Sequence, residues 1–281
     1  MNMNEKLHIK ADVIKALEED IGSGDITGML IPEETEVSAQ IITREPMILC
    51  GSGWVEETFY LLNPAICVQW FYEESQHVEA NAVICWIQGQ ARDLLCAERT
   101  ALNFLQTLSA TATQTHAYAE KLSGSSMQLL DTRKTIPGLR YAQKYAVRCG
   151  GGYNHRLGLY DAFLIKENHI KACGSITLAI QKARELFPDK KLEVEVENLE
   201  EFKMALSAAP DIIMLDNFNL EDMQSAVNLR GQQKAIKIEI SGNVNLENIT
   251  DIARTGADFV SVGAITKHIR AIDLTLLLGE P

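Results

Sequence analysis

The sequence lacks several features that would assign it quickly to a class of protein. It has no apolar run approaching the roughly 18 residues of a membrane span. Its polar start, MNMNEKLHIK, carries no apolar signal-peptide core. The six cysteines are scattered, with no CxxC pair and no histidine at metal-ligand spacing. We therefore expect a cytoplasmic protein whose cysteines are reduced thiols that mostly serve packing.

Positive charge is also scarce, since the formal net charge is −12 over 281 residues. Such a surface should repel nucleic acid and anionic membranes, so we expect neither as a partner. The exception is segment 131–171, which carries eight Lys/Arg against three Asp/Glu. A basic island in an acidic protein indicates a site for small anions, although Arg140, Lys144 and Arg148 also fit a solvated helix face.

The first 112 residues mix helical and strand patterns. Apolar residues alternate, as in half-buried strands, over 37–41, 66–70 and 83–87, and helical patterns cover 11–21, 54–62 and 94–108. We therefore expect an N-terminal α+β sandwich domain over residues 1–112, built on an antiparallel sheet.

Repeated strand–loop–helix units follow. The six apolar runs that we predict as parallel strands are 127–130, 162–165, 192–196, 212–215, 236–240 and 259–262. Asn198 with Glu201, and Asn219 with Asp222, have the spacing of helix N-caps, and Gly256 has that of a helix end. Such βα repeats predict a parallel sheet over residues 113–267, either doubly wound or closed as a barrel.

Polar or glycine motifs follow every one of these strands. They are Asp131-Thr-Arg-Lys134, Lys166-Glu-Asn-His169, Glu195 with Glu197, Asp216-Asn217, Ser241-Gly-Asn243 and Val262-Gly-Ala264. In a barrel the carboxyl ends of all strands open on one face, where the active site lies, whereas a doubly wound sheet uses one switch point. The sequence therefore favours an incomplete α/β barrel of about six strands.

Several of these motifs carry cations. Arg133-Lys134 after a strand, His155-Arg156 after a glycine run and Lys166 at the next strand end would converge on the barrel mouth and bind carboxylate or phosphate. A lone Arg-Lys pair is more often a surface loop. Lys166 also has the alternative of acting as a Schiff-base nucleophile.

Two carboxylates, Glu195 and Asp216, end neighbouring strands. Beside cations they suit Mg²⁺ shared with substrate phosphates, or equally they could be salt-bridge partners of the basic residues. Glycines at Ser241-Gly242 and Gly263 suit phosphate binding by backbone N–H groups, although glycine is also a common turn residue.

Taken together, these motifs closely resemble the quinolinate phosphoribosyltransferase family, also called nicotinate-nucleotide pyrophosphorylase (carboxylating). The resemblance covers nearly the whole chain. The matching stretches are 19–27, 98–103, 131–139, 144–147, 150–158, 165–169, 193–196, 215–218, 241–242 and 262–264.

The resemblance implies phosphoribosyl transfer from phosphoribosyl pyrophosphate to quinolinate, with decarboxylation, giving nicotinate mononucleotide, pyrophosphate and CO₂ in NAD biosynthesis. It also implies a C-terminal helix over 268–281 that joins the first domain. Finally, it implies a homodimer with shared active sites, in which Arg99 reaches the neighbour's barrel, and that dimer could assemble further.

The family motifs also imply residue roles. Quinolinate would be bound by Arg99, Thr132, Arg133, Lys134, His155, Arg156 and Lys166. Phosphoribosyl pyrophosphate would be bound by Lys134, Glu195, Asp216, Ser241, Gly242, Asn243, Val262, Gly263 and Ala264. The catalytic set would be Lys134, Lys166, Glu195 and Asp216, and the last two would hold Mg²⁺, directly or through waters. Many members have His-Ser where this chain has Lys267-His268, so the role of that pair stays open.

Three other functions compete with this assignment. The first is a relative of the same superfamily found with molybdenum transport, which tends to lose the lysine at the position of Lys166. The second is a Schiff-base lyase that uses Lys166. The third is a non-catalytic anion-binding protein, which has no use for Glu195 and Asp216 beside the cations.

Overall fold

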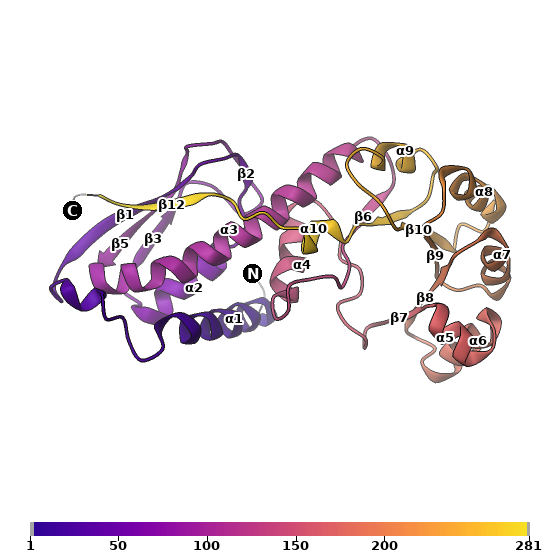
Figure 1. The fold of residues 1–281 in the computed structure, drawn as a ribbon, viewed down its shortest axis with the longest axis horizontal. Helices are drawn as coiled ribbons and strands as arrows, with labels where there is room; N and C mark the ends of the chain where they lie inside the picture. The colour runs from indigo at the N-terminus through magenta and orange to yellow at the C-terminus, as the bar shows by residue number, and fades with distance from the viewer. Residues whose placement is uncertain (1–2, 280–281) are drawn as a thin grey trace. The chain divides into compact units, whose positions relative to one another are not determined.

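The computed structural model describes residues 3–279, which form two compact units (Figure 1). The first unit combines the chain up to His116 with residues 136–151 and the chain from His268 onward, and the second combines 117–135 with 152–267. The division differs from the single boundary expected at 112/113, because it falls inside helix α3 (Ala91–Lys121) and residues 136–151 return to the first unit. No helix among residues 3–279 is long and apolar enough to cross a membrane.

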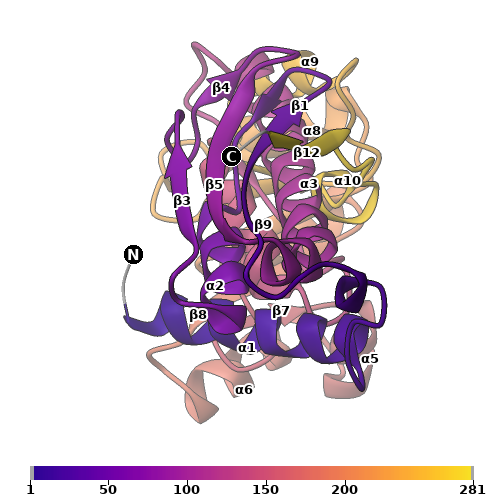
Figure 2. The ribbon, with the colours of Figure 1, turned by 90° about the vertical axis from the view of Figure 1, so that its left-hand side faces the viewer.

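The first unit is built on a four-stranded antiparallel sheet in the order β12-β1-β5-β3 (Figure 2). Its strands are β1 (Glu36–Thr43), β3 (Cys67–Trp70), β5 (Val83–Gln90) and β12 (Leu274–Gly279). A short two-stranded ribbon pairs β2 (Met47–Ile48) with β4 (His77–Val78). The antiparallel sheet expected from the alternating runs is therefore confirmed.

The C-terminal helix expected over 268–281 is wrong. Residues 274–279 form strand β12, which pairs antiparallel with β1 from Thr43↔Leu274 to Ser38↔Gly279, and residues 280–281 lie outside the described residues. The edge of β1 offers backbone donors and acceptors that a strand satisfies and a helix would not. Leu274 and Leu276, two apart, pack against the core of the sheet, so the period is that of a strand.

Helices complete the first unit. Helices α2 (Ser52–Leu62) and α3 pack on the sheet, and α1 (Met3–Ile21) and α4 (Arg140–Cys149) pack with them. Phe59, Leu94 and Leu105 are among the buried side chains between sheet and helices, and Trp54 is buried between α1 and its neighbours. Full burial of each such side chain contributes about 1.5–3 kcal/mol.

The second unit contains a sheet of six parallel strands in the order β6-β11-β10-β9-β8-β7. The strands are β6 (Gln128–Leu130), β7 (Ala162–Ile165), β8 (Lys191–Val196), β9 (Ile212–Asp216), β10 (Lys237–Ser241) and β11 (Phe259–Ser261). The first strand of the series pairs with the last, as in a barrel, and no ladder joins β6 to β7 within residues 3–279. The sheet is therefore a barrel ring left open at one place, and the doubly wound alternative is wrong.

Helices follow the strands in the expected order. They are α5 (Glu167–Cys173), α6 (Ile176–Leu186), α7 (Leu199–Ala208), α8 (Leu220–Arg230), α9 (Ile249–Ala253) and α10 (Ala264–Lys267). In Figure 1, α5–α8 lie outside β7–β10. The predicted N-caps are confirmed, because the Oδ1 atoms of Asn198 and Asn219 each accept a backbone N–H at 2.9 Å.

A buried ion pair ties α8, β10 and β11 together. Arg230, at the end of α8 and only 2% exposed, donates to the carboxylate of Asp258, which also accepts from the Ile238 backbone N–H and the Lys237 ammonium, each at 2.9 Å. Burial alone would raise the pKa of Asp258, but the Ile238 N–H and the two cations outweigh it and lower that pKa.

We expect Asp258→Ala to destabilise the chain by about 3 kcal/mol, because it leaves the Arg230 guanidinium buried without its carboxylate. A depressed pKa contributes stability at pH values above the unfolded value, so the deficit should shrink as the pH falls through the acid range. The control is Asp251→Ala, which removes an exposed pair with Arg254 and should cost less than about 1 kcal/mol. Urea titrations of both variants over a pH series measure the difference, and equal losses would contradict the assignment.

Candidate active site at the carboxyl ends of the barrel strands

The period of two along each parallel strand sets which side chains face the barrel interior. Glu193 and Glu195 share a face of β8, and Glu239 and Ser241 share a face of β10. Register pairs Ser241 with Asp216 of β9, so the polar residues at the strand ends lie side by side. The predicted convergence of the strand-end motifs is therefore what the fold produces.

These side chains line a cavity of about 540 Å³ at the carboxyl ends of the strands. The predicted site residues that line it are Thr132, Arg133, Lys134, His155, Arg156, Lys166, Glu195, Asp216, Ser241, Gly242 and Asn243. Lys267, whose role stayed open, lines it too. So do Asn217, which belonged to a strand-end motif but had no assigned role, and Glu239, which the motifs did not single out.

Four predicted residues do not line this cavity. Arg99 lies exposed on α3, in the first unit. Val262, Gly263 and Ala264 follow β11, and Gly263 packs closely on a neighbour, since a Cβ there would lie 2.9 Å from Cδ of Lys134.

Cations outnumber carboxylates around the cavity. Arg133, Lys134, Arg156, Lys166 and Lys267 face Glu195, Asp216 and the buried Glu239. Burial lowers the pKa of Arg156, and the nearby positive charge of Arg133 lowers it further. The partly buried, mutually repelling guanidiniums of Arg133 and Arg156, with three exposed lysines around the same cavity, favour a polyanionic ligand that would satisfy several cations at once.

Two carboxylates at the mouth are already oriented by neighbours. The Lys166 ammonium donates to Oε2 of Glu195. Asn217 Nδ2 donates to Oδ2 of Asp216 at 2.9 Å, and Asn243 Nδ2 donates to Oδ1 of Asn217 at 3.1 Å. The salt-bridge interpretation of Glu195 is therefore confirmed for Lys166, and Glu195 and Asp216 each keep lone pairs for a ligand.

The turn after β10 depends on glycine. Gly242 has φ +93°, and a Cβ there would lie 2.2 Å from Oδ1 of Asn217. Asn217 and Asn243 also have positive φ, at 57° and 51°. The backbone is thus held in a conformation that brings this turn and the Asn217 loop into close contact.

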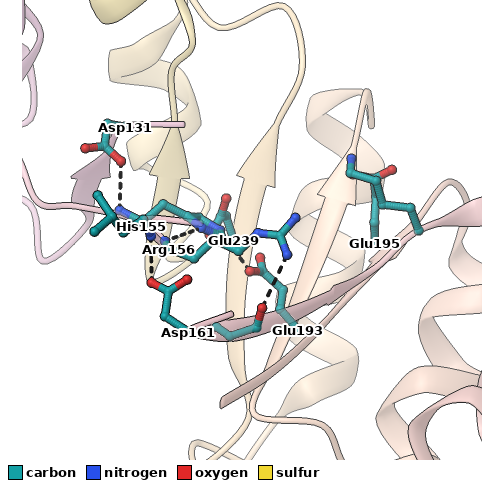
Figure 3. Close-up of polar contacts among 10 residues, drawn as sticks. Asp131, His155, Arg156, Asp161, Glu193, Glu195 and Glu239 are labelled. Atoms are coloured by element: carbon teal, nitrogen blue, oxygen red, sulfur yellow. Dashed lines mark hydrogen bonds and ion pairs between the residues drawn. The ribbon is translucent and has the colours of Figure 1, made fainter. Parts of the chain in front are cut away.

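Asp131, at the end of β6, organises the segment that carries His155 (Figure 3). Its fully buried carboxylate accepts from Asn154 Nδ2 at 2.6 Å and from the His155 backbone N–H at 2.9 Å. Leu130 and Tyr153 form a parallel bridge beside it. Asp131 therefore holds the 153–155 segment against the first strand of the barrel.

His155 faces two buried carboxyl groups (Figure 3). Its Nε2 lies 2.8 Å from Oε2 of Glu193 and 3.5 Å from Oε2 of Glu239, while Nδ1 accepts the Arg156 backbone N–H at 2.7 Å. An acceptor Nδ1 assigns the imidazole proton to Nε2, directed at Glu193. Burial raises the pKa of Glu193 to about 7, and burial together with the nearby Glu193 carboxylate raises the pKa of Glu239 well above its usual value.

The sequence-based interpretation gave no role to Glu193 or Glu239. Each is an acidic residue between two apolar residues in the middle of a buried strand, and that pattern was the available signal.

Comparisons with known proteins agree across the whole chain. The family models for the N-terminal and C-terminal domains of quinolinate phosphoribosyl transferase match residues 25–109 and 111–277. A probable nicotinate-nucleotide pyrophosphorylase (carboxylating) of Synechocystis sp. is 42% identical over 262 residues, covering 92% of this chain and 89% of the relative. The nicotinate-nucleotide pyrophosphorylase (carboxylating) of Mycobacterium leprae is 39% identical over 270 residues, covering 93% and 94%.

The fold comparison gives the same result. The structure of the nicotinate-nucleotide pyrophosphorylase from Francisella tularensis superposes with a TM-score of 0.94 at 50% identity, covering 98% of this chain and 97% of that one.

The turn at Gly242 gives a test of this cavity. Gly242→Ala should weaken binding of inorganic phosphate at least tenfold, because the new methyl group would displace Asn217 and with it the turn. Gly256→Ala is the matched control: it shares a positive φ of 81°, but its Cβ would meet nothing closer than 3.8 Å. Both should lose about 1–2 kcal/mol of stability from backbone strain. Calorimetric titration of both variants decides the point, and equal affinities would show that the turn does not bind anions.

Proposed function

The chain belongs to the quinolinate phosphoribosyltransferase family, and on that premise we propose how its side chains divide the work of the reaction. The reaction transfers the phosphoribosyl group of phosphoribosyl pyrophosphate to quinolinate, with decarboxylation, and gives nicotinate mononucleotide, pyrophosphate and CO₂ in NAD biosynthesis. The observation that carries the assignment of roles is the excess of cations around one cavity at the strand ends.

Quinolinate carries two carboxylates on adjacent ring carbons. Arg133, Arg156 and Lys166 line the cavity and would pair with them, and the guanidinium forks favour bidentate contact. Thr132, Lys134 and His155 would complete the site, with the His155 ring held by Glu193 and its backbone N–H by Asp131. A dianion would thus relieve the repulsion between Arg133 and Arg156.

Phosphoribosyl pyrophosphate would lie across the other side of the cavity. Glu195 and Asp216 would accept from the ribose hydroxyls, and the backbone of Ser241, Gly242 and Asn243 would hold the 5-phosphate. Val262, Gly263 and Ala264 would support this phosphate from the next strand end. Lys134, between the two groups of residues, would contact both substrates, and the Lys267 ammonium beside it would bind phosphate.

Mg²⁺ fits the residues present. The carboxylate oxygens of Glu195 and Asp216 are hard donors. Those of their lone pairs that do not accept from Lys166 or Asn217 suit direct or water-mediated contact with the ion. When bound, the ion would neutralise charge that develops on the pyrophosphate.

The chain's own groups act on charge at each stage of the transfer. As the bond from ribose to pyrophosphate lengthens, positive charge on the ribose carbon would be stabilised by Glu195 and Asp216. Negative charge on the leaving group would be stabilised by Lys134. The cations around the ring would orient its nitrogen toward the ribose, so no covalent nucleophile on the chain is required. The Lys166 ammonium, paired with Glu195, would bind substrate rather than form a Schiff base.

Two further features belong to the same proposal. We infer that the enzyme acts in the cytoplasm as a homodimer, with Arg99 of one subunit completing the quinolinate site of its neighbour. Arg99 is exposed on α3, and this supports a contact with the other subunit of the dimer. Further association of such dimers would leave these sites unchanged.

We expect nicotinate to fail as a substrate in a turnover assay in which quinolinate succeeds. Nicotinate has one carboxylate and would leave the repulsion between the partly buried Arg133 and Arg156 only half compensated, which costs several kcal/mol rather than the roughly 1 kcal/mol of a missing contact. The value of kcat/KM should therefore fall by at least about a thousandfold. A comparable kcat/KM for nicotinate would overturn the proposed arrangement of cations.

Sharing of the site predicts complementation between two inactive variants. Equal mixing of Arg99→Ala and Lys166→Ala chains should restore roughly one quarter of wild-type activity, because half the dimers are mixed and each has one intact site. Mixing Lys166→Ala with Glu195→Ala is the control: both residues line the same cavity, so no intact site results. If mixed dimers form in both experiments and neither recovers activity, Arg99 serves its own subunit.

A further inference from the structure

Two cysteines far apart in the sequence meet in the first unit. Cys50, at the start of the loop into α2, is fully buried, and Cys149, the last residue of α4, is half-buried. Their Sγ atoms lie within 4.8 Å of each other and of a carboxylate oxygen of Glu74. The proposed reaction uses none of these groups.

The surroundings hold both sulfurs in place. The Cys50 backbone N–H donates to Ser109 Oγ at 3.0 Å, and Ser109 Oγ donates back to the Cys50 carbonyl, also at 3.0 Å. Ser75, in a tight turn with φ 72°, and Tyr145 lie near the Cys149 thiol, and both act to lower its pKa. The pair is therefore preorganised on either side by backbone and side-chain contacts.

We propose that Cys50 and Cys149 form a reversible intramolecular disulfide when the protein meets a small-molecule disulfide such as glutathione disulfide. A disulfide requires the sulfurs to approach to about 2.05 Å, and side-chain rotation of two neighbouring thiols supplies most of that movement. Among residues 3–279, no two of the other four cysteines occur together in a cluster of three or more potential metal ligands.

The thiols differ in a way that sets the order of the steps. The neighbouring Cys50 thiol lowers the pKa of Cys149, against the effect of burial, whereas burial raises the pKa of Cys50 well above its usual value. Cys149 is also the sulfur with access to solvent. It is therefore the attacking thiolate, and Cys50 is the resolving thiol.

The electrons and atoms balance over two exchanges. The Cys149 thiolate attacks one sulfur of glutathione disulfide, forms a mixed disulfide and releases one glutathione, which takes up the proton that Cys149 lost. Cys50 then attacks the Cys149 sulfur, and its own proton passes to the second departing glutathione. Two protein thiols lose two electrons, and the disulfide of the oxidant gains them.

A metal site is the other chemistry that two thiols and a carboxylate could support. Glu74 argues against it, because its carboxylate already accepts from the Gly51 backbone N–H at 2.7 Å, the Ser52 backbone N–H at 3.2 Å and the Ser52 hydroxyl. These bonds satisfy backbone N–H groups at the start of α2 that have no partner within the helix, so Glu74 acts as a helix cap. The two sulfurs remain as the reactive pair.

The experiment uses the full chain, fully reduced, then incubated with glutathione disulfide near neutral pH. Remaining thiols are blocked with N-ethylmaleimide, and peptides are identified by mass spectrometry without reduction. In wild type we expect a Cys50–Cys149 cross-link that dithiothreitol reverses. In Cys50→Ala, which cannot resolve the intermediate, a glutathione adduct should accumulate on Cys149 instead.

Cys149→Ser should lose the cross-link, and Cys173→Ser, which replaces another half-buried cysteine, should retain it. Melting curves of each variant establish that it is folded, and Cys149→Ser alone still tests the proposal if Cys50→Ala does not fold. Wild type that ends with glutathione on Cys149 and a free Cys50 would overturn it. So would one equivalent of zinc in the purified protein that Cys149→Ser loses and Cys173→Ser keeps.

Discussion

Charges buried inside the barrel need partners, and that requirement shapes the whole of the second unit. Glu193 and Glu239 stand inside apolar strands, so His155 is held against them. Asp131, equally buried, fixes the segment that brings His155 there. The position of His155 at the cavity thus depends on carboxylates placed deeper in the barrel.

The same requirement makes the site complementary to its substrates. Cations that are costly to leave unpaired gather at the open end of the barrel, and the ligands that suit them are dianions and pyrophosphates. The acidic outer surface of the protein repels anions, whereas the cations at the open end of the barrel attract them locally. Binding energy is thus concentrated at the cavity.

Sequence patterns predicted the second unit almost strand for strand, because apolar runs bounded by polar turns have few other solutions in a βα repeat. They also predicted most of the cavity lining, since the side chains after parallel strands must share one edge. The helix over 268–281 was implied by the family resemblance and not by these patterns, and the strand that forms instead over 274–279 is fixed by the open edge of β1, far away in sequence. The patterns left out Glu193 and Glu239, whose roles depend on which face of a strand is inward.

Strand β12 has a consequence for how the protein is made. The sheet of the first unit includes residues from β1 and from 274–279, so its outer strand leaves the ribosome only after the entire second unit has been synthesised. Until then the edge of β1 is exposed while the barrel strands are emerging nearby, and strand edges pair readily with the wrong partner. The second unit has all of its strands once β11 has emerged, whereas the first stays incomplete until residues 274–279 follow, so nascent chains stalled before residue 274 should be the ones that most need a chaperone.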